Sequence, residues 1–292
     1  MIRTLSLKDR ESVMKLIYFT KFLKGLSAEQ IGETAASLGF TGLDLAIRPG
    51  QAVNSANVSS ALPAAMKIWR DRGITVPLAT MEGTPTDPHK KETETIYAAC
   101  AEHGIPNIKL GYWLWHEGPW SGAKLPYWKG VEQIRADLAE FQRLGEKFGV
   151  RSLVHTHCDN YYGVNASSAR HLVNGFDPRH VGIYLDPAHL SADGETLAMG
   201  IDISGEYLHM VAAKNVRYQL TSTSGPANWK HDWCQLSEGL VNWPNALTTL
   251  KNAGYDGAIS VHGEYSGPEV LAEILVKVKT DVDFLKQHLG VN

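Results

Sequence analysis

The chain has 292 residues and a formal net charge of -3, and 43% of its residues are hydrophobic while 20% are charged. This composition is typical of a globular protein with a sizeable core, and the length suits one large α/β domain. The slightly acidic balance leaves no basic surplus to drive binding to nucleic acid or to anionic membranes. The three cysteines, Cys100, Cys158 and Cys234, are far apart and odd in number, which indicates a reducing, cytoplasmic location and not a disulfide framework.

Residues 1–13 are polar and charged, with no apolar segment of signal-peptide length, so we interpret them as an N-terminal extension to a domain that spans 14–292. Within this domain, short apolar runs predict strands, and apolar residues three or four apart predict helices. The expected strands are 15–20, 42–47, 74–80, 107–111, 151–157, 181–185, 207–215 and 257–262. The expected helices are 27–38, 58–72, 89–103, 131–148, 166–173, 195–203, 240–252 and 269–289.

Strands and helices therefore alternate strictly along the chain. This order predicts parallel strands, and eight such units favour a single-domain α/β fold, a closed (β/α)8 TIM barrel. The alternative is an open, doubly wound sheet. No glycine-rich phosphate loop follows the first strand, which argues against a dinucleotide-binding or P-loop domain. No run of apolar residues is long enough to span a bilayer.

Polar side chains recur where the predicted strands end, which is where parallel barrels carry their chemistry. In the segment 181–190, VGIYLDPAHL, four apolar positions lead into Asp186, and His189 follows three residues later. Side chains alternate along a strand, so His155 and His157 share one face. The simpler interpretation of the segment is an aspartate that caps the next turn, with a surface histidine nearby. The full set of candidates is Glu82, Lys109, His155, His157, Asp186, His189, Lys214, His262 and Glu264.

Imidazole nitrogens and carboxylate oxygens around one cavity suit a divalent ion such as Zn, Mn, Fe or Co, whereas Mg favours shells of oxygen alone. The alternative is a polar pocket of hydrogen-bonded histidines without a metal. Lys109 and Lys214 are costly inside a barrel unless they are paired or face the site. They would contact an oxyanion of the substrate, or else form ion pairs with Glu82 or Asp186.

Two long aromatic insertions, 111–128 and 216–239, follow the fourth and seventh predicted strands. Their tryptophans are Trp113, Trp115, Trp120, Trp128, Trp229 and Trp233. We expect Trp113, Trp115 and Trp229 to wall the pocket and to stack on the apolar face of a sugar. The alternatives are packing within the insertions and subunit contacts in a homo-oligomer.

Several segments resemble the xylose isomerase-like TIM-barrel superfamily, the sugar phosphate isomerases and epimerases, over nearly the whole chain from Met14. They are SAEQIGETAASLGFTGLDL, FQRLGEKFGVRSLVHTH, VGIYLDPAHL with its LDxxH element, LHMVAAKNV and YDGAISVHGEY. The resemblance implies a divalent metal held by a glutamate, an aspartate, a histidine and a glutamate on strands five to eight. The two glutamates would also move protons on either side of the substrate carbon.

This chain departs from that pattern at most ligand positions, although Asp186 and His189 match it. The departures are His155 for the strand-five glutamate, Met210 and Ala212 for strand-seven histidines, and His262 for the strand-eight glutamate. Lys214 keeps the lysine that follows in strand seven, and Glu264 lies two residues after His262. A remodelled metal site would use His155, Asp186 and Glu264, with His189 or His262; a metal-free member is the alternative.

The resulting hypothesis is an enzyme that isomerises, epimerises or dehydrates a sugar, a polyol or a related hydroxy-carbonyl compound. Its chemistry would be proton abstraction next to a carbonyl by Glu264 or His155, with the oxyanion stabilised by Lys214 or a metal. The alternatives are a lyase or hydrolase on the same scaffold, and a non-catalytic carbohydrate-binding protein with a degenerate site. DNA-repair endonucleases of the superfamily are disfavoured because they need more zinc ligands and a basic groove.

Overall fold

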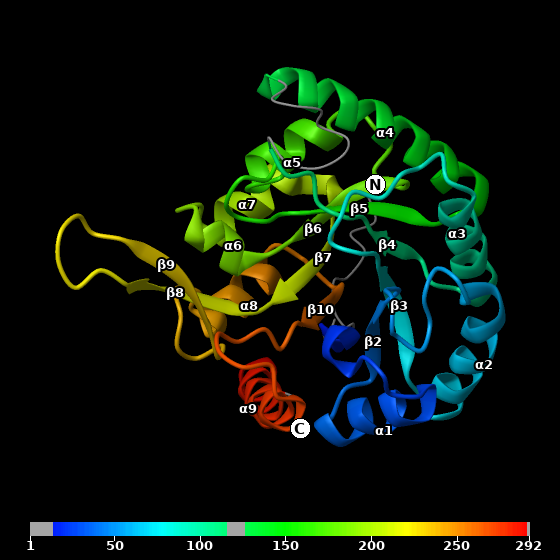
Figure 1. Ribbon diagram of the computed structural model, residues 1–292, viewed down its shortest axis with the longest axis horizontal. Helices are drawn as coiled ribbons and strands as arrows, with labels where there is room; N and C mark the ends of the chain where they lie inside the picture. Colours follow the sequence, from blue (N-terminus) through cyan, green and yellow to red (C-terminus); the bar gives the residue numbers. More distant parts are fainter. Residues whose placement is uncertain (1–13, 116–125, 291–292) are drawn as a thin grey trace, which may run out of the picture.

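A computed structural model describes residues 14–115 and 126–290. Eight parallel strands close into a barrel in the order β1-β10-β7-β6-β5-β4-β3-β2, and helices surround it (Figure 1). The strands are β1 (Lys15–Phe19), β2 (Gly42–Ala46), β3 (Thr75–Thr80), β4 (Asn107–Lys109), β5 (Arg151–His155), β6 (Val181–Leu185), β7 (Leu208–Ala213) and β10 (Ala258–Val261). The single-domain (β/α)8 barrel is confirmed, and the open sheet is excluded. The predicted extension, 1–13, lies outside the described residues.

The outer helices follow the expected apolar stripes closely. They are α1 (Ala28–Leu38), α2 (Val58–Asp71), α3 (Lys91–His103), α4 (Tyr127–Phe148), α5 (Ala166–Val173), α6 (Pro187–Ala192), α7 (Leu197–Ser204), α8 (Trp243–Asn252) and α9 (Leu271–Leu289). Helix α1 begins after Ser27, because Ser27 and Gln30 form a capping box in which the side chain of each residue accepts a hydrogen bond from the backbone N–H of the other. Helix α1 ends at Leu38, because the following Gly39 takes a left-handed conformation at φ 86°. None of the helices in the described ranges carries an apolar stretch long enough to cross a membrane.

Side chains inside the barrel form a small apolar cluster that is separate from the layer between strands and helices. Its members are Ile17, Leu78, Leu153, Tyr184, Met210 and Ala212. Met210 and Ala212 are fully buried there. The strand-seven positions at which the family resemblance implied histidines therefore fill the apolar barrel interior in this chain.

Two elements differ from the sequence-based expectation. The predicted seventh strand, 207–215, ends at Ala213, and an antiparallel hairpin of β8 (Asn215–Leu220) and β9 (Trp229–Cys234) occupies most of the insertion at 216–239. The hairpin projects from the barrel in Figure 1 (yellow). The second difference is α6, which had not been expected directly after β6. It forms because Asp186 caps its first turn and Pro187 occupies its first position.

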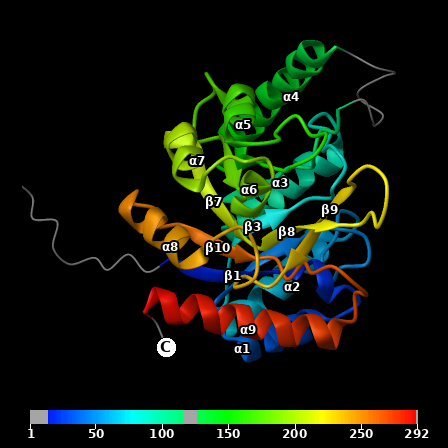
Figure 2. The same ribbon diagram turned by 90° about the vertical axis from the view of Figure 1, so that its left-hand side faces the viewer.

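The closing helix α9 lies across one side of the barrel beside α1 (Figure 2). Its Asp281 is buried and accepts hydrogen bonds from the Leu236 amide at 2.9 Å and from the Tyr265 hydroxyl at 2.8 Å. This carboxylate therefore joins α9 to the segments that follow β9 and β10. Burial raises the pKa of Asp281 to about 6, although its hydrogen bonds act in the opposite direction.

We expect Asp281 to make the folding stability depend on pH. The pKa of Asp281 is higher in the folded than in the unfolded chain, so protonation of this group stabilises the fold. The contribution to the free energy of unfolding is complete below about pH 4 and is lost as the pH rises through about 6. The loss is on the order of 2 kcal/mol. Urea unfolding between these limits should show the difference between wild type and Asp281→Asn shrinking by that amount. A difference that is constant with pH would contradict the assignment.

Candidate active site

A cavity of about 610 Å³ opens at the carboxyl ends of the barrel strands. Every barrel strand contributes a side chain to its wall, either from its last residues or from the residues directly after it. Seven of the residues predicted for the site line this cavity: Glu82, Lys109, His155, His157, Lys214, His262 and Glu264. Asp186 and His189 are fully buried just behind that wall, in contact with Lys214 and His155.

Lys214 lies at the centre of a chain of charges. Its Nζ is 3.0 Å from Glu264 Oε2 and 3.4 Å from Asp186 Oδ2, and the other oxygen of Glu264 is 2.9 Å from Lys21 Nζ. Burial disfavours the charged form of Glu264, but Lys214, His262 and Lys21 outweigh it and hold the pKa of that carboxyl well below its usual range. Likewise, burial opposes the ionisation of Lys214, but Asp186 and Glu264 raise its pKa. The ion pair expected as an alternative for Lys214 is thus formed, and Lys214 also lines the cavity.

Asp186 both caps the helix that follows it and takes part in the charged cluster beside the cavity. One carboxylate oxygen, Oδ1, accepts hydrogen bonds from the amides of Ala188 and His189 and so caps α6. The other, Oδ2, is buried without a hydrogen-bond partner and faces three groups. These are His155 Nε2 at 3.3 Å, Lys214 Nζ at 3.4 Å and His189 Nε2 at 3.7 Å. Burial would raise the pKa of Asp186, but Lys214 and the two histidines hold it well below its usual value.

The histidines of the cavity wall are neutral at neutral pH where their pKa shifts are resolved. Burial lowers the pKa of His155 well below its usual value, and burial together with Lys214 lowers the pKa of His157 to about 4. His155 Nδ1 is 2.8 Å from the Tyr112 hydroxyl, and His262 Nε2 is 2.8 Å from the Tyr184 hydroxyl. Tyrosines thus orient two of the imidazoles.

Lys109 differs from Lys214 because its Nζ is buried and has no hydrogen-bond partner. It lies 3.5 Å from the centre of the Tyr112 ring, which gives it a cation–π contact. Burial, with Arg48 as the next cause, lowers the pKa of Lys109 well below its usual value. Lys109 lines the cavity, and among the described residues its amine has neither a hydrogen-bond partner nor an ion-pair partner.

Sequence reasoning missed several residues of the cavity wall, namely Lys21, Asp44, Arg48, Tyr112 and Tyr184. Asp44 is the clearest case. It is fully buried, accepts hydrogen bonds from Thr80 and Ser260, and interrupts the otherwise apolar strand GLDLAI. A carboxylate inside an apolar strand was the available signal, because a buried charge needs partners.

The tryptophans do not wall the cavity as expected within the described part of the chain. Trp113 is buried outside its lining, and Trp115 and Trp229 are 37% and 56% exposed. Trp229 pairs with Leu220 at the free end of the hairpin, whereas Trp233 lies nearer the barrel with its ring 4.5 Å from Lys214 Nζ. Trp128 is exposed on α4, and Trp120 lies outside the described residues.

The donor types around Asp186 suit a metal, because three buried donor atoms there lack hydrogen bonds: His155 Nε2, Asp186 Oδ2 and His189 Nε2. Their spacing does not fit a preformed centre. Two clusters among the described residues bring one donor atom from each of three side chains within 4.8 Å, and neither contains His155, Asp186 or Glu264. The Lys214 ammonium instead joins the two carboxylates. The barrel cavity is therefore arranged around a lysine cation.

The fold and this polar cavity define a TIM-barrel protein with a site at the carboxyl ends of its strands. Residues 33–288 match the xylose isomerase-like TIM barrel family, and the chain belongs to this family. A curated relative is the uncharacterized protein YfiH of Bacillus subtilis (strain 168), which is 22% identical over 95% of this chain and 100% of its own length.

Three similar solved structures show the range of proteins that share this fold. The 3-keto-D-glucoside 4-epimerase YcjR from E. coli is 16% identical over 94% of this chain and 99% of its own, with a TM-score of 0.71. The IOLI protein with a binding zinc atom is 15% identical over 94% and 99%, with a TM-score of 0.72. The probable 3-DHS dehydratase AsbF from Bacillus anthracis is 14% identical over 94% and 99%, with a TM-score of 0.67. At these identities the likeness concerns the fold alone.

Proposed function

We propose that this protein is an isomerase- or epimerase-type enzyme that moves a proton next to the carbonyl group of a sugar or a related hydroxy-carbonyl compound. The observation that carries the proposal is the pairing of Glu264 with Lys214 in the wall of a polar cavity. A carboxylate beside an ammonium provides a base next to a site for the oxyanion that proton abstraction creates. The epimerases among proteins of this fold are consistent with such a substrate class.

In this proposal Glu264 is the base, Lys214 stabilises the oxyanion by its charge, and Lys109 donates a hydrogen bond to it. While Glu264 is paired with Lys214, its low pKa makes it a weak base. A substrate oxygen that approaches Lys214 competes for the ammonium, weakens its pairing with Glu264 and so raises the basicity of that carboxylate. Substrate binding and activation of the base are thereby linked in one step.

The same first step permits a second outcome. When the β-carbon, the neighbour of the deprotonated carbon, bears a hydroxyl group, the enolate can expel that group as water with a proton from an acid of the site, and the result is dehydration instead of epimerisation. AsbF, a probable dehydratase, shares this fold. A dehydratase is therefore the second candidate, and a hydrolase or a non-catalytic carbohydrate-binding protein is the remaining alternative.

Hydrogen exchange with the solvent tests the proposal. We expect a keto-sugar or hydroxy-ketone substrate to incorporate deuterium from heavy water at the carbon beside its carbonyl, and Glu264→Gln to lower that rate by about 100-fold or more, because an amide cannot accept the proton. The matched control is Glu269→Gln, which changes an exposed carboxylate of the same loop.

Three results would count against this assignment. Turnover without exchange favours hydride transfer or hydrolysis. The exception is a single base that is shielded from solvent and returns to the substrate the same hydrogen that it removed. An unchanged rate in Glu264→Gln would move the role of base to His155. Sugar binding with neither turnover nor exchange would support the carbohydrate-binding alternative.

A further inference from the structure

We propose that Cys158, Asp159 and His231 form a binding site for a divalent transition-metal ion, best matched by Zn²⁺, outside the barrel cavity. Cys158 and Asp159 follow β5, and His231 is on β9 of the hairpin. The lining of the barrel cavity includes none of the three. The inference is independent of the proposed reaction.

The distances between the donor atoms suit one tetrahedral ion. Cys158 Sγ is 3.8 Å from His231 Nδ1. Asp159 approaches the sulfur with Oδ2 at 3.6 Å and His231 Nδ1 with Oδ1 at 3.5 Å, and one of its oxygens lies within 4.8 Å of both other donor atoms. Zinc bonds of about 2.3 Å to sulfur and about 2.1 Å to nitrogen or oxygen place neighbouring tetrahedral ligands about 3.3–3.7 Å apart. Thiolate and imidazole ligands also select zinc over magnesium or calcium.

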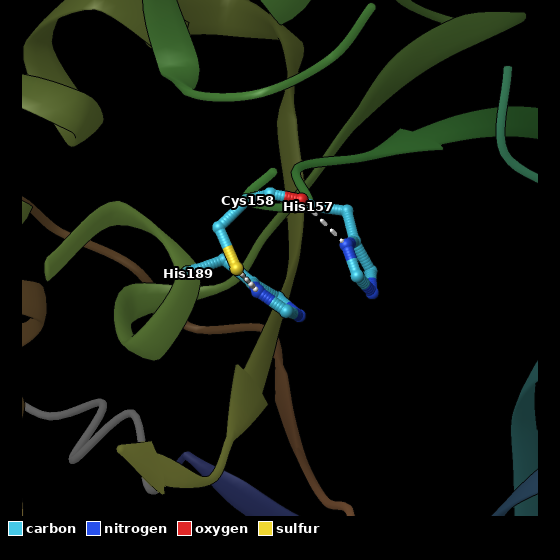
Figure 3. A group of neighbouring side chains, drawn as sticks. All are labelled: His157, Cys158 and His189. Atoms are coloured by element: carbon cyan, nitrogen blue, oxygen red, sulfur yellow. Dashed lines mark hydrogen bonds between the residues drawn. The ribbon is translucent and has the colours of Figure 1, made fainter. Parts of the chain in front are cut away.

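A second cluster shares Cys158 and consists of His157, Cys158 and His189 (Figure 3). It is less suited to hold the ion. Figure 3 shows the rings of His157 and His189 side by side, and His157 Nδ1 bonds to the carbonyl of Cys158 while only His189 Nδ1 points at the sulfur. The two rings are tilted by 31° with their centroids 3.9 Å apart, and His157 directs its Nδ1 at a carbonyl, so Asp159 and His231 are the better-placed ligands.

His189 contacts the sulfur of Cys158 without being one of the three proposed ligands. Its Nδ1 is 2.9 Å from Cys158 Sγ, and its Nε2 faces Asp186 Oδ2 at 3.7 Å. The contact from His189 Nδ1 holds the Cys158 sulfur in position, and a thiol that binds a metal does so as the thiolate. An Asp186–His189–Cys158 contact chain would then connect the metal site to the charges of the barrel cavity.

The backbone of the site is strained, which fits a functional role. Asp159 is the one non-glycine residue with a positive φ, 75°, among residues 14–115 and 126–290. Such conformations cost about 1 kcal/mol or more and gather at functional sites. A metal here would tie the hairpin to the barrel and fix Trp233, whose ring lies over Lys214.

Titration of the chelator-treated full-length protein with Co²⁺ tests the site. We expect one ion per chain, a thiolate-to-cobalt charge-transfer absorption band, and displacement of the cobalt by Zn²⁺. Cys158→Ser should abolish the band, and His231→Asn, a change at a partly exposed position, should weaken Co²⁺ binding about 10-fold or more. Cys234→Ser is the matched control and should keep the band.

The same titration has clear contrary outcomes. A charge-transfer band that survives in Cys158→Ser, or no bound cobalt in the wild type, would overturn the proposal. Loss of the ion in His155→Gln but not in His231→Asn would place it in the barrel cavity and would equally overturn it. Zn²⁺ should also raise the melting temperature of the wild type more than that of His231→Asn.

Discussion

Replacement of Lys214 by methionine should lower substrate turnover by about two to three orders of magnitude, the usual effect of removing one group that stabilises a developing oxyanion. Lys214 is the cation between Glu264 and Asp186, and it lines the cavity. Without it, the pKa values of both carboxyl groups should rise, because the charge that keeps them ionised is gone. The change therefore affects both the oxyanion site and the base.

The measurement is the rate of solvent hydrogen exchange with a turned-over substrate, at saturating and at low substrate concentration. Lys214→Arg keeps the charge and separates a loss of folding from a loss of chemistry. Lys24→Met, at an exposed position outside the cavity lining, is the matched control. A wild-type rate in Lys214→Met would transfer the oxyanion role to Lys109. Recovery of that variant by a divalent metal would mean that the ion takes the place of the ammonium.

The barrel was predictable because each strand is a short apolar run and each helix carries an apolar stripe with a glycine at its end. Both patterns are local, and their alternation leaves few topologies. The hairpin of β8 and β9 was missed because it depends on tertiary contacts. Asn215 closes its base by bonding to the backbone of Leu236 and Val241, and Tyr218 bonds to the carbonyl of Ala192 on α6.

The types of residue in the candidate site could be predicted from the sequence, whereas the contacts between their side chains could not. The parallel arrangement of the strands brings Lys214, which follows β7, and His262 and Glu264, which follow β10, to one cavity. It cannot show which side chains pair, and the Lys214 contacts to both carboxylates depend on side-chain positions from different strands. The cluster at Cys158 was not anticipated, because His231 reaches it only through the unpredicted hairpin. The same hairpin puts Trp233, and not Trp229, beside the site.

Removal of the Asp44 carboxylate should strongly reduce stability. Its Oδ1 accepts a hydrogen bond from Thr80 at 2.5 Å, and its Oδ2 accepts from Ser260 at 2.8 Å and from Tyr184 at 3.3 Å. The carboxylate thus joins β2 to β3, β6 and β10 inside the barrel. Asp44→Ala would leave three buried hydroxyl groups without their acceptor, at a cost of about 3–5 kcal/mol in the free energy of unfolding.

Urea unfolding of the purified variants measures this cost. Asp44→Asn should lose less than Asp44→Ala, because its amide oxygen still accepts one hydrogen bond while its NH₂ group faces hydroxyls that must reverse their direction. Asp202→Ala, at an exposed position on α7, is the control and should stay within about 0.5 kcal/mol of wild type. Tyr184 also holds His262, so the loss of Asp44 should loosen an imidazole of the cavity wall. If Asp44→Ala unfolded at the wild-type urea concentration, the hydroxyls would have found other partners, and the carboxylate would serve the cavity and not the fold.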